Sequence, residues 1–185
     1  VVAYLRYLLE SFHSLAIAKD IRLHFLAKED FIIMDYDPEK LQTLIYNLLS
    51  NALKFTPHGG DVYVQVTTMS GSAQKAGLPR LPANGERKEM VGDYLTLTFE
   101  DTGAGIPSEQ LPFIFDRFFQ SKSSNKGTNP SAGTGIGLAF ARELAQVMGG
   151  RLWAECPPNQ GSIFYLDLPA RECPPASAAL ITPGN

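Results

Sequence analysis

Three polar side chains recur on one face of a predicted helix. Asn47, Asn51 and Lys54 follow one another at steps of four and three residues, which places them within about 60° of each other on an α-helix. Asparagine is a poor helix former because its amide competes for backbone hydrogen bonds. An amide oxygen can ligate a hard cation such as Mg²⁺, and a lysine one turn later can neutralise phosphate charge. The alternative is an ordinary polar flank.

A second candidate feature is the segment DTGAGIP, which follows a predicted strand. Asp101 ends the apolar alternation of that strand, so its carboxylate can face a pocket and accept a hydrogen bond from an exocyclic amine. Gly103 and Gly105 allow the backbone to turn sharply and to approach a flat ring. The alternative is a strand-ending turn, in which Asp and Gly are common.

A third feature is the glycine-rich run GTGIG that opens another predicted helix. Gly133, Gly135 and Gly137 precede the apolar residues of that helix. Free amides at a helix N-terminus, together with the helix dipole, attract anions such as phosphate. The alternative is a flexible hinge with an ordinary helix cap.

The elements that position these residues can be predicted from periodicity. Asp37 and Pro38 are a helix N-cap and first residue, and Pro57 and the glycines after it end that helix by about residue 56. The other predicted helices and strands, in chain order, are a helix over 1–18, strands Ile21–Leu26, Phe31–Asp35, Asp61–Thr68 and Tyr94–Asp101, short helical pieces around Gln110–Phe119, a helix over Ile136–Met148, and a closing hairpin of RLWAEC and SIFYLDL. This order predicts an α+β fold, with helices packed on one face of a mixed, mostly antiparallel sheet.

Three further segments lack periodicity. Residues 69–92 are rich in Gly, Pro, Ser and Lys and are predicted to form an exposed excursion. Residues 107–137 are predicted to form a lid-like loop. Residues 170–185 resemble a linker.

Composition excludes several classes of protein. The chain has 185 residues and a formal charge of −3, which favours one domain without the basic field of a nucleic-acid binder. No apolar run reaches the roughly 20 residues needed to cross a bilayer. Two cysteines are too few for a disulfide scaffold or a cysteine-based zinc site, and they favour a reducing compartment. Two nucleotide motifs are excluded because GxxxxGK[ST] is absent and DTGAGIP has Ser108 in place of the third Rossmann glycine.

Together, the order and spacing of these motifs resemble the catalytic ATP-binding domain of two-component sensor histidine kinases. LIYNLLSNALKFTPHGG resembles the N box of that family, DTGAGIP its first glycine box, FIFDRFFQ its F box and GTGIGLAFARELAQVMGG its second glycine box. The wider superfamily includes type II topoisomerase, mismatch-repair and heat-shock chaperone ATPase domains. The resemblance implies a two-layer α/β sandwich, the Bergerat-type fold, over residues 19–169, with the helix over 1–18 leading in from a missing dimerisation domain.

The resemblance also implies a role for each matched residue. Asn51 would be the principal Mg²⁺ ligand, assisted by Asn47, while Lys54 would contact phosphates and Asp101 the adenine amine. The other implied ATP-binding residues line the base or lie beneath the lid: Gly103, Gly105, Ile106, Phe119, Gly133, Thr134, Gly135, Gly137 and Leu138. Many relatives carry a basic residue where Gln120 stands, and Lys122 or Arg117 is the candidate replacement.

One substitution favours a kinase over an ATPase. Hydrolysing relatives usually carry a glutamate base at the position of Asn47, and an amide cannot take a proton from water. The family's phosphoacceptor histidine is missing, because His13, His24 and His58 all lack its sequence context. The chain would therefore be a monomeric fragment that phosphorylates a histidine on its dimerisation domain and serves a response regulator, on the cytoplasmic side of a membrane-bound sensor.

Two alternatives remain. One is a serine kinase of the anti-sigma-factor class, which is usually shorter and lacks this tail. The other is a degenerate nucleotide-binding module that has lost catalysis. Intact Asn51, Asp101 and glycine boxes count against the second, while Gln120 leaves it open.

Overall fold

The helix that carries the two asparagines begins where the sequence predicts. The computed structural model describes residues 1–69, 92–120, 134–158 and 160–170. In it, the Asp37 carboxylate accepts hydrogen bonds from the backbone N–H groups of Glu39 and Lys40, both at 3.1 Å, and caps α2 (Pro38–Phe55). At the other end, the Thr56 hydroxyl donates to the Ala52 carbonyl at 2.7 Å, and Pro57 follows.

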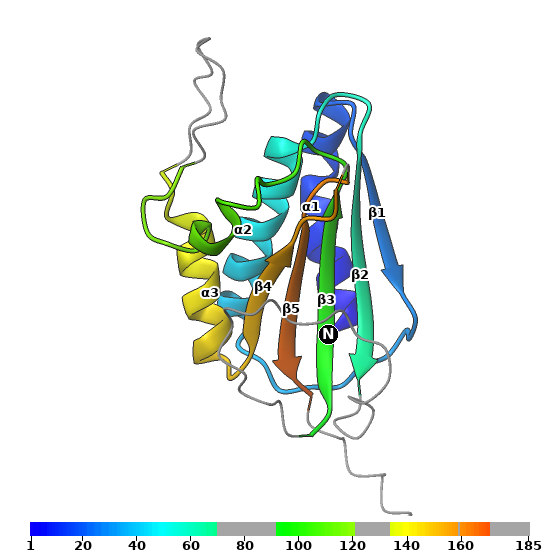
Figure 1. Ribbon diagram of the computed structural model, residues 1–185. Coiled ribbons are helices and arrows are strands. Elements are labelled where there is room, and N and C mark those ends of the chain that lie inside the picture. Colours follow the sequence, from blue (N-terminus) through cyan, green and yellow to red (C-terminus); the bar gives the residue numbers. More distant parts are fainter. Residues whose placement is uncertain (70–91, 121–133, 159, 171–185) are drawn as a thin grey trace, which may run out of the picture.

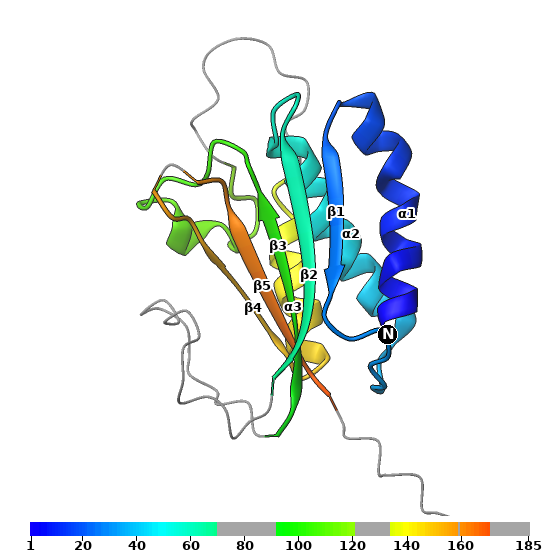
Figure 2. The same cartoon turned by 90° about the vertical axis from the view of Figure 1, so that its right-hand side faces the viewer.

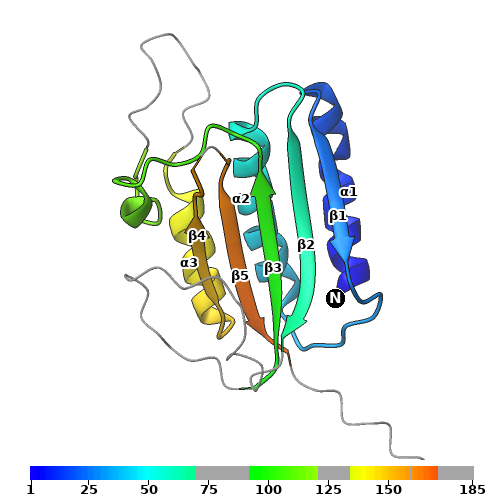
Figure 3. The same ribbon diagram turned by 45° about the vertical axis from the view of Figure 1, so that its right-hand side comes forward.

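Five strands form one sheet in the described residues, in the order β1-β2-β3-β5-β4 (Figure 3). They are β1 (Arg22–Ala27), β2 (Asp61–Met69), β3 (Tyr94–Asp101), β4 (Arg151–Glu155) and β5 (Ile163–Pro169). β1 and β2 are parallel, and the other neighbouring pairs are antiparallel. The prediction of a mixed, mostly antiparallel sheet is confirmed, as is the closing hairpin of β4 and β5.

The described helices cover one face of this sheet and form the second layer (Figures 1 and 2). α1 (Val2–Ala18) and α3 (Gly137–Val147) lie on either side of α2. The fully buried residues of α2 include Leu41, Leu44 and Ile45, which share one core with Val64 and Phe99 of the sheet. Strand residues that alternate with these point to the opposite face. The hydrophobic core therefore fixes α2 along the sheet and leaves its flanks facing α1 and α3.

The predicted strand over Phe31–Asp35 is wrong. No residue of this segment pairs with a strand in the described structure. Ile32 and Met34 are buried in the core, while Phe31 and Ile33 are 90% and 69% exposed. The alternation that suggested a strand therefore reflects an extended chain that packs one side against the core. The predicted helical pieces at 110–119 reduce to a short 3₁₀ turn, η2 (Leu111–Phe113).

All the candidate motifs converge on the same end of the sheet. β3 ends there at Asp101, α2 ends there at Phe55, and α3 begins there at Gly137 (Figure 1). The β4–β5 hairpin turns at this end too, because Glu155 pairs with Ile163 and Ile163 pairs with Glu100. Helix and strand boundaries thus bring together segments that lie more than 100 residues apart in the sequence.

Two predicted segments lie largely outside the described residues. These are the excursion over 69–92, of which only Met69 and Gly92 are described, and the tail over 170–185, of which only Ala170 is described. Among the helices that the structure describes, none is long and apolar enough to span a bilayer.

Candidate functional site

The two asparagines and the lysine of α2 are half-buried. Asn47 faces the start of α3, and helix periodicity places Asn51 and Lys54 on the same flank. The Asn47 side-chain amide donates to the Thr43 carbonyl at 2.8 Å, which fixes the orientation of its oxygen. That oxygen lies against the first residue of α3, since a Cβ added to Gly137 would be 2.8 Å from it. Glycine at position 137 therefore lets the N-terminus of α3 approach the asparagine face closely.

Asp101 is the last residue of β3 and lies at the start of the loop formed by the first glycine box. It is 4% exposed. Its carboxylate accepts hydrogen bonds from the Gly103 N–H at 2.8 Å and from the backbone and hydroxyl of Ser162. Burial raises the pKa of Asp101 above its ordinary value, against the opposing effect of these hydrogen bonds. An acceptor buried in this way and held at a fixed angle suits recognition of an amine hydrogen.

The rest of the first glycine box packs between α2 and the β4–β5 hairpin. A Cβ on Gly103 would lie 2.6 Å from the Phe55 carbonyl oxygen at the end of α2. On the other side, the Ile106 N–H donates to the Cys156 Sγ at 3.0 Å. Gly105 and Ile106 are both half-buried. The loop therefore forms a wall beside Asp101.

Ser162 and Cys156 were both missed from the sequence. Each lies 50 or more residues from the loop that it contacts, and although both fall in the predicted closing hairpin, neither residue type marks a binding site there by itself. Only their position in a hairpin that closes at the Asp101 end of the sheet could have pointed to them.

The second glycine box leads into a helix N-terminus without a side-chain cap. Ile136 occupies the N-cap position of α3 and supplies no side-chain hydrogen bond, so the first amides of α3 are open to an anion. Thr134 is exposed, Leu138 is half-buried, and the Gly135 carbonyl accepts from the Phe118 N–H at 2.8 Å. Gly133 lies outside the described residues.

The predicted F box joins this helix to the core. Phe115 meets Phe164 of β5 edge-on at 6.4 Å, and Phe119 packs against the core cluster. Phe118 is 71% exposed and has a φ of 67°. Phe115 and Phe119 are therefore core residues, whereas Phe118 projects from the surface.

The basic candidates occupy different positions. Arg117 forms an ion pair with Glu143 of α3 at 2.6 Å, and Lys122 lies outside the described residues. The Lys54 ammonium lies 5.1 Å from the centre of the Phe55 ring, near the end of α2. Of the two described cations, Lys54 lies on the asparagine face of α2, whereas Arg117 is paired with α3.

The oxygen donors on this flank of α2 suit a cation that is held mainly by the phosphates of a bound nucleotide. In the described part of the chain, no group of three or more His, Cys, Asp or Glu residues could hold a metal ion. The protein oxygens at this flank of α2 are the amide oxygens of Asn47 and Asn51. Mg²⁺ typically takes one or two protein ligands and completes its shell with waters and phosphates, so this sparse donor set is compatible with it.

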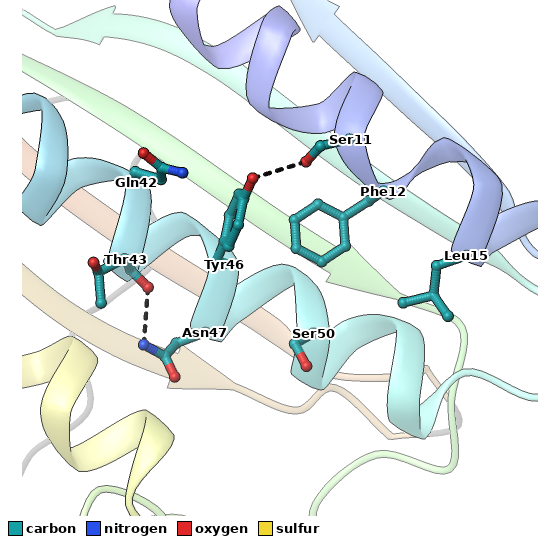
Figure 4. A pocket seen from close by; sticks show the side chains of 8 residues that line it. All are labelled: Ser11, Phe12, Leu15, Gln42, Thr43, Tyr46, Asn47 and Ser50. Carbon is teal, nitrogen blue, oxygen red and sulfur yellow. Dashed lines mark hydrogen bonds between the residues drawn. The ribbon is translucent and has the colours of Figure 1, made fainter.

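An open groove of about 610 Å³ lies between α1 and α2, and its lining reaches across α2 as far as Asn47 (Figure 4). Its lining residues are polar or apolar but carry no formal charge: Ser11, Phe12, Leu15, Gln42, Thr43, Tyr46, Asn47 and Ser50. The hydroxyls of Ser11 and Tyr46 are hydrogen-bonded to each other at 3.0 Å. This groove therefore has volume without the cations that a polyphosphate requires.

The three histidines have local partners or lie exposed. His24 stacks on Tyr63 at 4.5 Å and bonds to the Asp61 carboxylate at 2.8 Å. The pKa of Asp61 is lowered by its hydrogen bonds to Arg22 and His24. His58 lies 3.2 Å from Asp20, and His13 is exposed on α1.

Comparison with known proteins identifies the family. Residues 36–172 match the family described as Histidine kinase-, DNA gyrase B-, and HSP90-like ATPase. The sensor histidine kinase WalK of Bacillus subtilis is 30% identical over 141 residues, and the aerobic respiration control sensor protein ArcB of Escherichia coli is 37% identical over 134 residues. The chain belongs to this family, as an ATP-binding domain homologous to the catalytic domains of sensor histidine kinases.

The matches concern one part of larger relatives. The alignments cover 76% and 72% of this chain but only 20% of WalK and 14% of ArcB. Among solved structures, the nucleotide-free catalytic domain of histidine kinase ThkA superimposes with a TM-score of 0.68 at 21% identity, over 91% of each chain. Full-length ShkA in complex with AMPPNP gives a TM-score of 0.69 at 23% identity, over 91% of this chain and 29% of ShkA. These structures confirm the predicted fold.

Proposed function

We propose that this domain binds Mg²⁺-ATP and transfers the γ-phosphoryl group to a histidine on a dimerisation domain of the same protein. The observation that carries the proposal is the convergence, at one end of the sheet, of a buried carboxylate, an amide-bearing helix face and an open helix N-terminus. A base, a cation–phosphate unit and a phosphate chain would each find a matching partner there.

Each residue takes a specific part in this proposal. Asp101 accepts a hydrogen bond from the adenine amine, and the loop through Gly103, Gly105 and Ile106 lies against the base. Asn51, with Asn47 beside it, supplies amide oxygens, and Lys54 neutralises phosphate charge. The remaining proposed contacts come from the F box and the second glycine box: Phe119, Gly133, Thr134, Gly135, Gly137 and Leu138. Bound Mg²⁺ would offset the charge of the phosphate oxygens.

The chemistry at Asn47 favours transfer over hydrolysis. The one acidic residue of α2, Glu39, lies in its first turn, at the opposite end from Asn51. A water molecule near the phosphates would therefore find an amide on α2 and no carboxylate to accept its proton. In the proposed step, an imidazole nitrogen attacks phosphorus, the bond from phosphorus to the β,γ-bridging oxygen breaks, and ADP leaves. The enzyme's part is positioning and charge neutralisation.

Other parts of the proposal concern the parent protein. The helix over 1–18 would lead in from the dimerisation domain, residues 19–169 would form the catalytic domain with its lid over 107–137, and 170–185 would be a linker. A response regulator would receive the phosphoryl group. The isolated domain would be monomeric, and the parent protein would hold it on the cytoplasmic side of a membrane.

Calorimetric titration with AMPPNP, with and without Mg²⁺, tests the nucleotide site. We expect Asp101→Asn to weaken binding about 30-fold, which corresponds to about 2 kcal/mol for the loss of a hydrogen bond to a charged acceptor. Glu100→Gln is the matched control, because Glu100 precedes Asp101 on β3 and points to the opposite face of the sheet. Its affinity should equal that of the wild type. Absence of AMPPNP binding by the wild type at millimolar concentration would exclude the proposed function.

The same titration has a predictable pH dependence. Burial raises the pKa of Asp101, so on acidification its carboxylate gains a proton at a higher pH than an ordinary carboxyl group does. Affinity for AMPPNP should fall through that range in the wild type and stay level in Asp101→Asn. An identical decline in both proteins would assign the pH dependence to another group.

Phosphotransfer requires a second experiment. Radiolabelled ATP, the domain and a purified histidine-bearing dimerisation domain should yield an acid-labile, alkali-stable phosphoprotein, as expected for phosphohistidine. Acid-stable label on serine would instead support the serine-kinase alternative. Tight nucleotide binding without any transfer would support the degenerate binding module.

A further inference from the structure

Cys156 lies at the junction of the Asp101 loop and the β4–β5 hairpin. It directly follows β4, is half-buried, and forms no disulfide. Its Sγ accepts a hydrogen bond from the Ile106 N–H at 3.0 Å and donates one to the Gly161 carbonyl at 3.3 Å. One thiol therefore serves as acceptor for one segment and donor for the other.

The two segments joined by this thiol are the ones that hold Asp101. Gly161 packs so closely on Asp101 that a Cβ at position 161 would overlap the Asp101 carbonyl oxygen. The next residue, Ser162, accepts from the Asp101 N–H at 3.0 Å and donates to its carboxylate. On the other side, Ile106 belongs to the loop that leaves Asp101. The distance between these walls determines the space beside the Asp101 carboxylate.

The space around the sulfur is filled. A Cβ on Gly105 would lie 2.6 Å from Sγ and 3.1 Å from the Gln160 carbonyl oxygen. A longer side chain than cysteine at position 156 would therefore displace the loop. Alanine would fit but would leave the Ile106 N–H without its acceptor. A partly buried donor that loses its partner destabilises the arrangement that buries it, and the loop can relieve this by moving toward water.

We propose that Cys156 is a positioning residue for the nucleotide base: its thiol holds the Ile106 loop against the hairpin, so that Asp101 and the loop present a fixed adenine-shaped space. This inference rests on the proposed nucleotide site. It assigns Cys156 no covalent chemistry and no direct contact with phosphate. Its effect should therefore appear in base affinity and base selectivity, and not in binding of the phosphate chain.

Three variants test this role. Cys156→Ala removes both hydrogen bonds, and Cys156→Ser keeps a donor and an acceptor in a similar volume. Cys173→Ala removes the chain's other thiol and controls for loss of a thiol as such. Each is titrated with AMPPNP, with the guanine analogue GMPPNP, and with inorganic tripolyphosphate, all in the presence of Mg²⁺.

We expect Cys156→Ala to bind AMPPNP about tenfold more weakly, as for one neutral hydrogen bond, with a reduced preference for AMPPNP over GMPPNP. Tripolyphosphate binding should be unchanged. Cys156→Ser should restore most of the AMPPNP affinity, and Cys173→Ala should match the wild type. A purely structural defect would lower all three affinities together, and serine would not restore adenine selectivity.

A second measurement does not depend on nucleotide. Amide hydrogen exchange at Ile106 should accelerate in Cys156→Ala and stay near the wild-type rate in Cys156→Ser. The role would be disproved by unchanged Ile106 exchange in Cys156→Ala together with wild-type adenine selectivity. Failure of the wild type itself to bind AMPPNP would reject the proposed function, while the exchange data would still report whether Cys156 holds the loop.

Discussion

The two flanks of α2 are joined to their neighbouring helices in different ways. On the α1 side, side chains meet: Phe12 packs edge-on against Tyr46 at 4.8 Å, and the Tyr46 hydroxyl bonds to Ser11 (Figure 4). On the side that faces α3 and the Asp101 loop, which we call the nucleotide side, glycines allow backbone to approach directly. Gly137 lies against the Asn47 amide oxygen, and Gly161 lies against Asp101.

The groove lies mainly toward α1, whereas the polar groups suited to bind a nucleotide lie mainly on the nucleotide side. The groove of about 610 Å³ lies between α1 and α2 and meets the nucleotide side at Asn47; the Ser11 and Tyr46 hydroxyls in it bond to each other, and none of its lining residues is charged. The nucleotide side presents a carboxylate, two amides, an ammonium group and an open helix N-terminus. Because glycines let the backbone approach closely on the nucleotide side, the polar groups there can point toward one another, and no glycine side chain fills the space between them. Substitutions on the α1 side should therefore change stability alone, and those on the nucleotide side should change binding.

The largest expected effect is that of Gly161→Ala. Its Cβ would overlap the Asp101 carbonyl oxygen, so the hairpin must move away from Asp101. We expect a loss of stability of about 3 kcal/mol, as for severe overpacking, together with loss of detectable AMPPNP binding. Urea unfolding followed by circular dichroism, and calorimetry, measure the two effects.

Gly59→Ala is the control for Gly161→Ala. Gly59 has a φ of 79° but faces open space, so alanine there costs about 1 kcal/mol for the left-handed backbone and should leave binding unchanged. An equal loss of stability in both variants would contradict the explanation that position 161 requires glycine because it packs closely on Asp101.

Phe12→Ala tests the α1 side. Removing this ring, which packs on Tyr46 and the core, should lower stability by about 2 kcal/mol, less than for a fully buried phenylalanine because Phe12 is half-buried. The dissociation constant for AMPPNP should stay within about twofold of the wild type. Ile17→Ala, at a position that is 65% exposed on the same helix, should change neither quantity. A tenfold loss of affinity in Phe12→Ala would mean that the α1 side shapes the nucleotide site.

Gly137→Ala should weaken nucleotide binding and barely change stability, which is the reverse of the result expected for Phe12→Ala. Its Cβ would lie 2.8 Å from the Asn47 oxygen, so either the amide or the start of α3 must shift. We expect AMPPNP affinity to fall about tenfold, while stability changes by less than about 1 kcal/mol because alanine is the better helix former. Ala141→Gly is the inverse control: because it also removes a fully buried methyl group, it should destabilise α3 by about 2 kcal/mol, and it should leave affinity unchanged. Equal affinity in the wild type and Gly137→Ala would show that the Asn47–Gly137 contact does not matter for binding.

The sequence was most informative where local rules decide structure. The Asp37 cap, the apolar stripe of α2 and the alternation of β2 and β3 each depend on neighbouring residues, and the structure confirms all three. The predicted strand at 31–35 failed because alternation records which side chains are buried and not which backbone groups pair. A strand also needs a neighbour, and that is decided by the rest of the chain.

The residues of the candidate site also differ in whether the sequence could predict them. Asn47, Asn51 and Asp101 could be selected because each breaks a local preference: an amide in a helix interior, or a carboxylate at the end of an apolar strand. Cys156 and Ser162 break no local preference. Their roles come from the closing of the β4–β5 hairpin against a loop about 50 residues earlier, a contact that depends on tertiary structure and leaves no periodic signal.

The smallest expected effect is that of the hydrogen bond between Tyr46 and Ser11 on the α1 side. A double-mutant cycle of Tyr46→Phe and Ser11→Ala should give a coupling energy of about 0.5 kcal/mol, because the bond is exposed to water, which competes for both hydroxyls. AMPPNP affinity should be the same in all four proteins of the cycle. Tyr46 directly precedes Asn47 on α2, so this cycle tests the difference between the two flanks at adjacent residues. If loss of the Tyr46 hydroxyl weakened AMPPNP binding while Ser11→Ala did not, that hydroxyl would belong to the nucleotide side, and the boundary between the flanks would have to be moved toward α1.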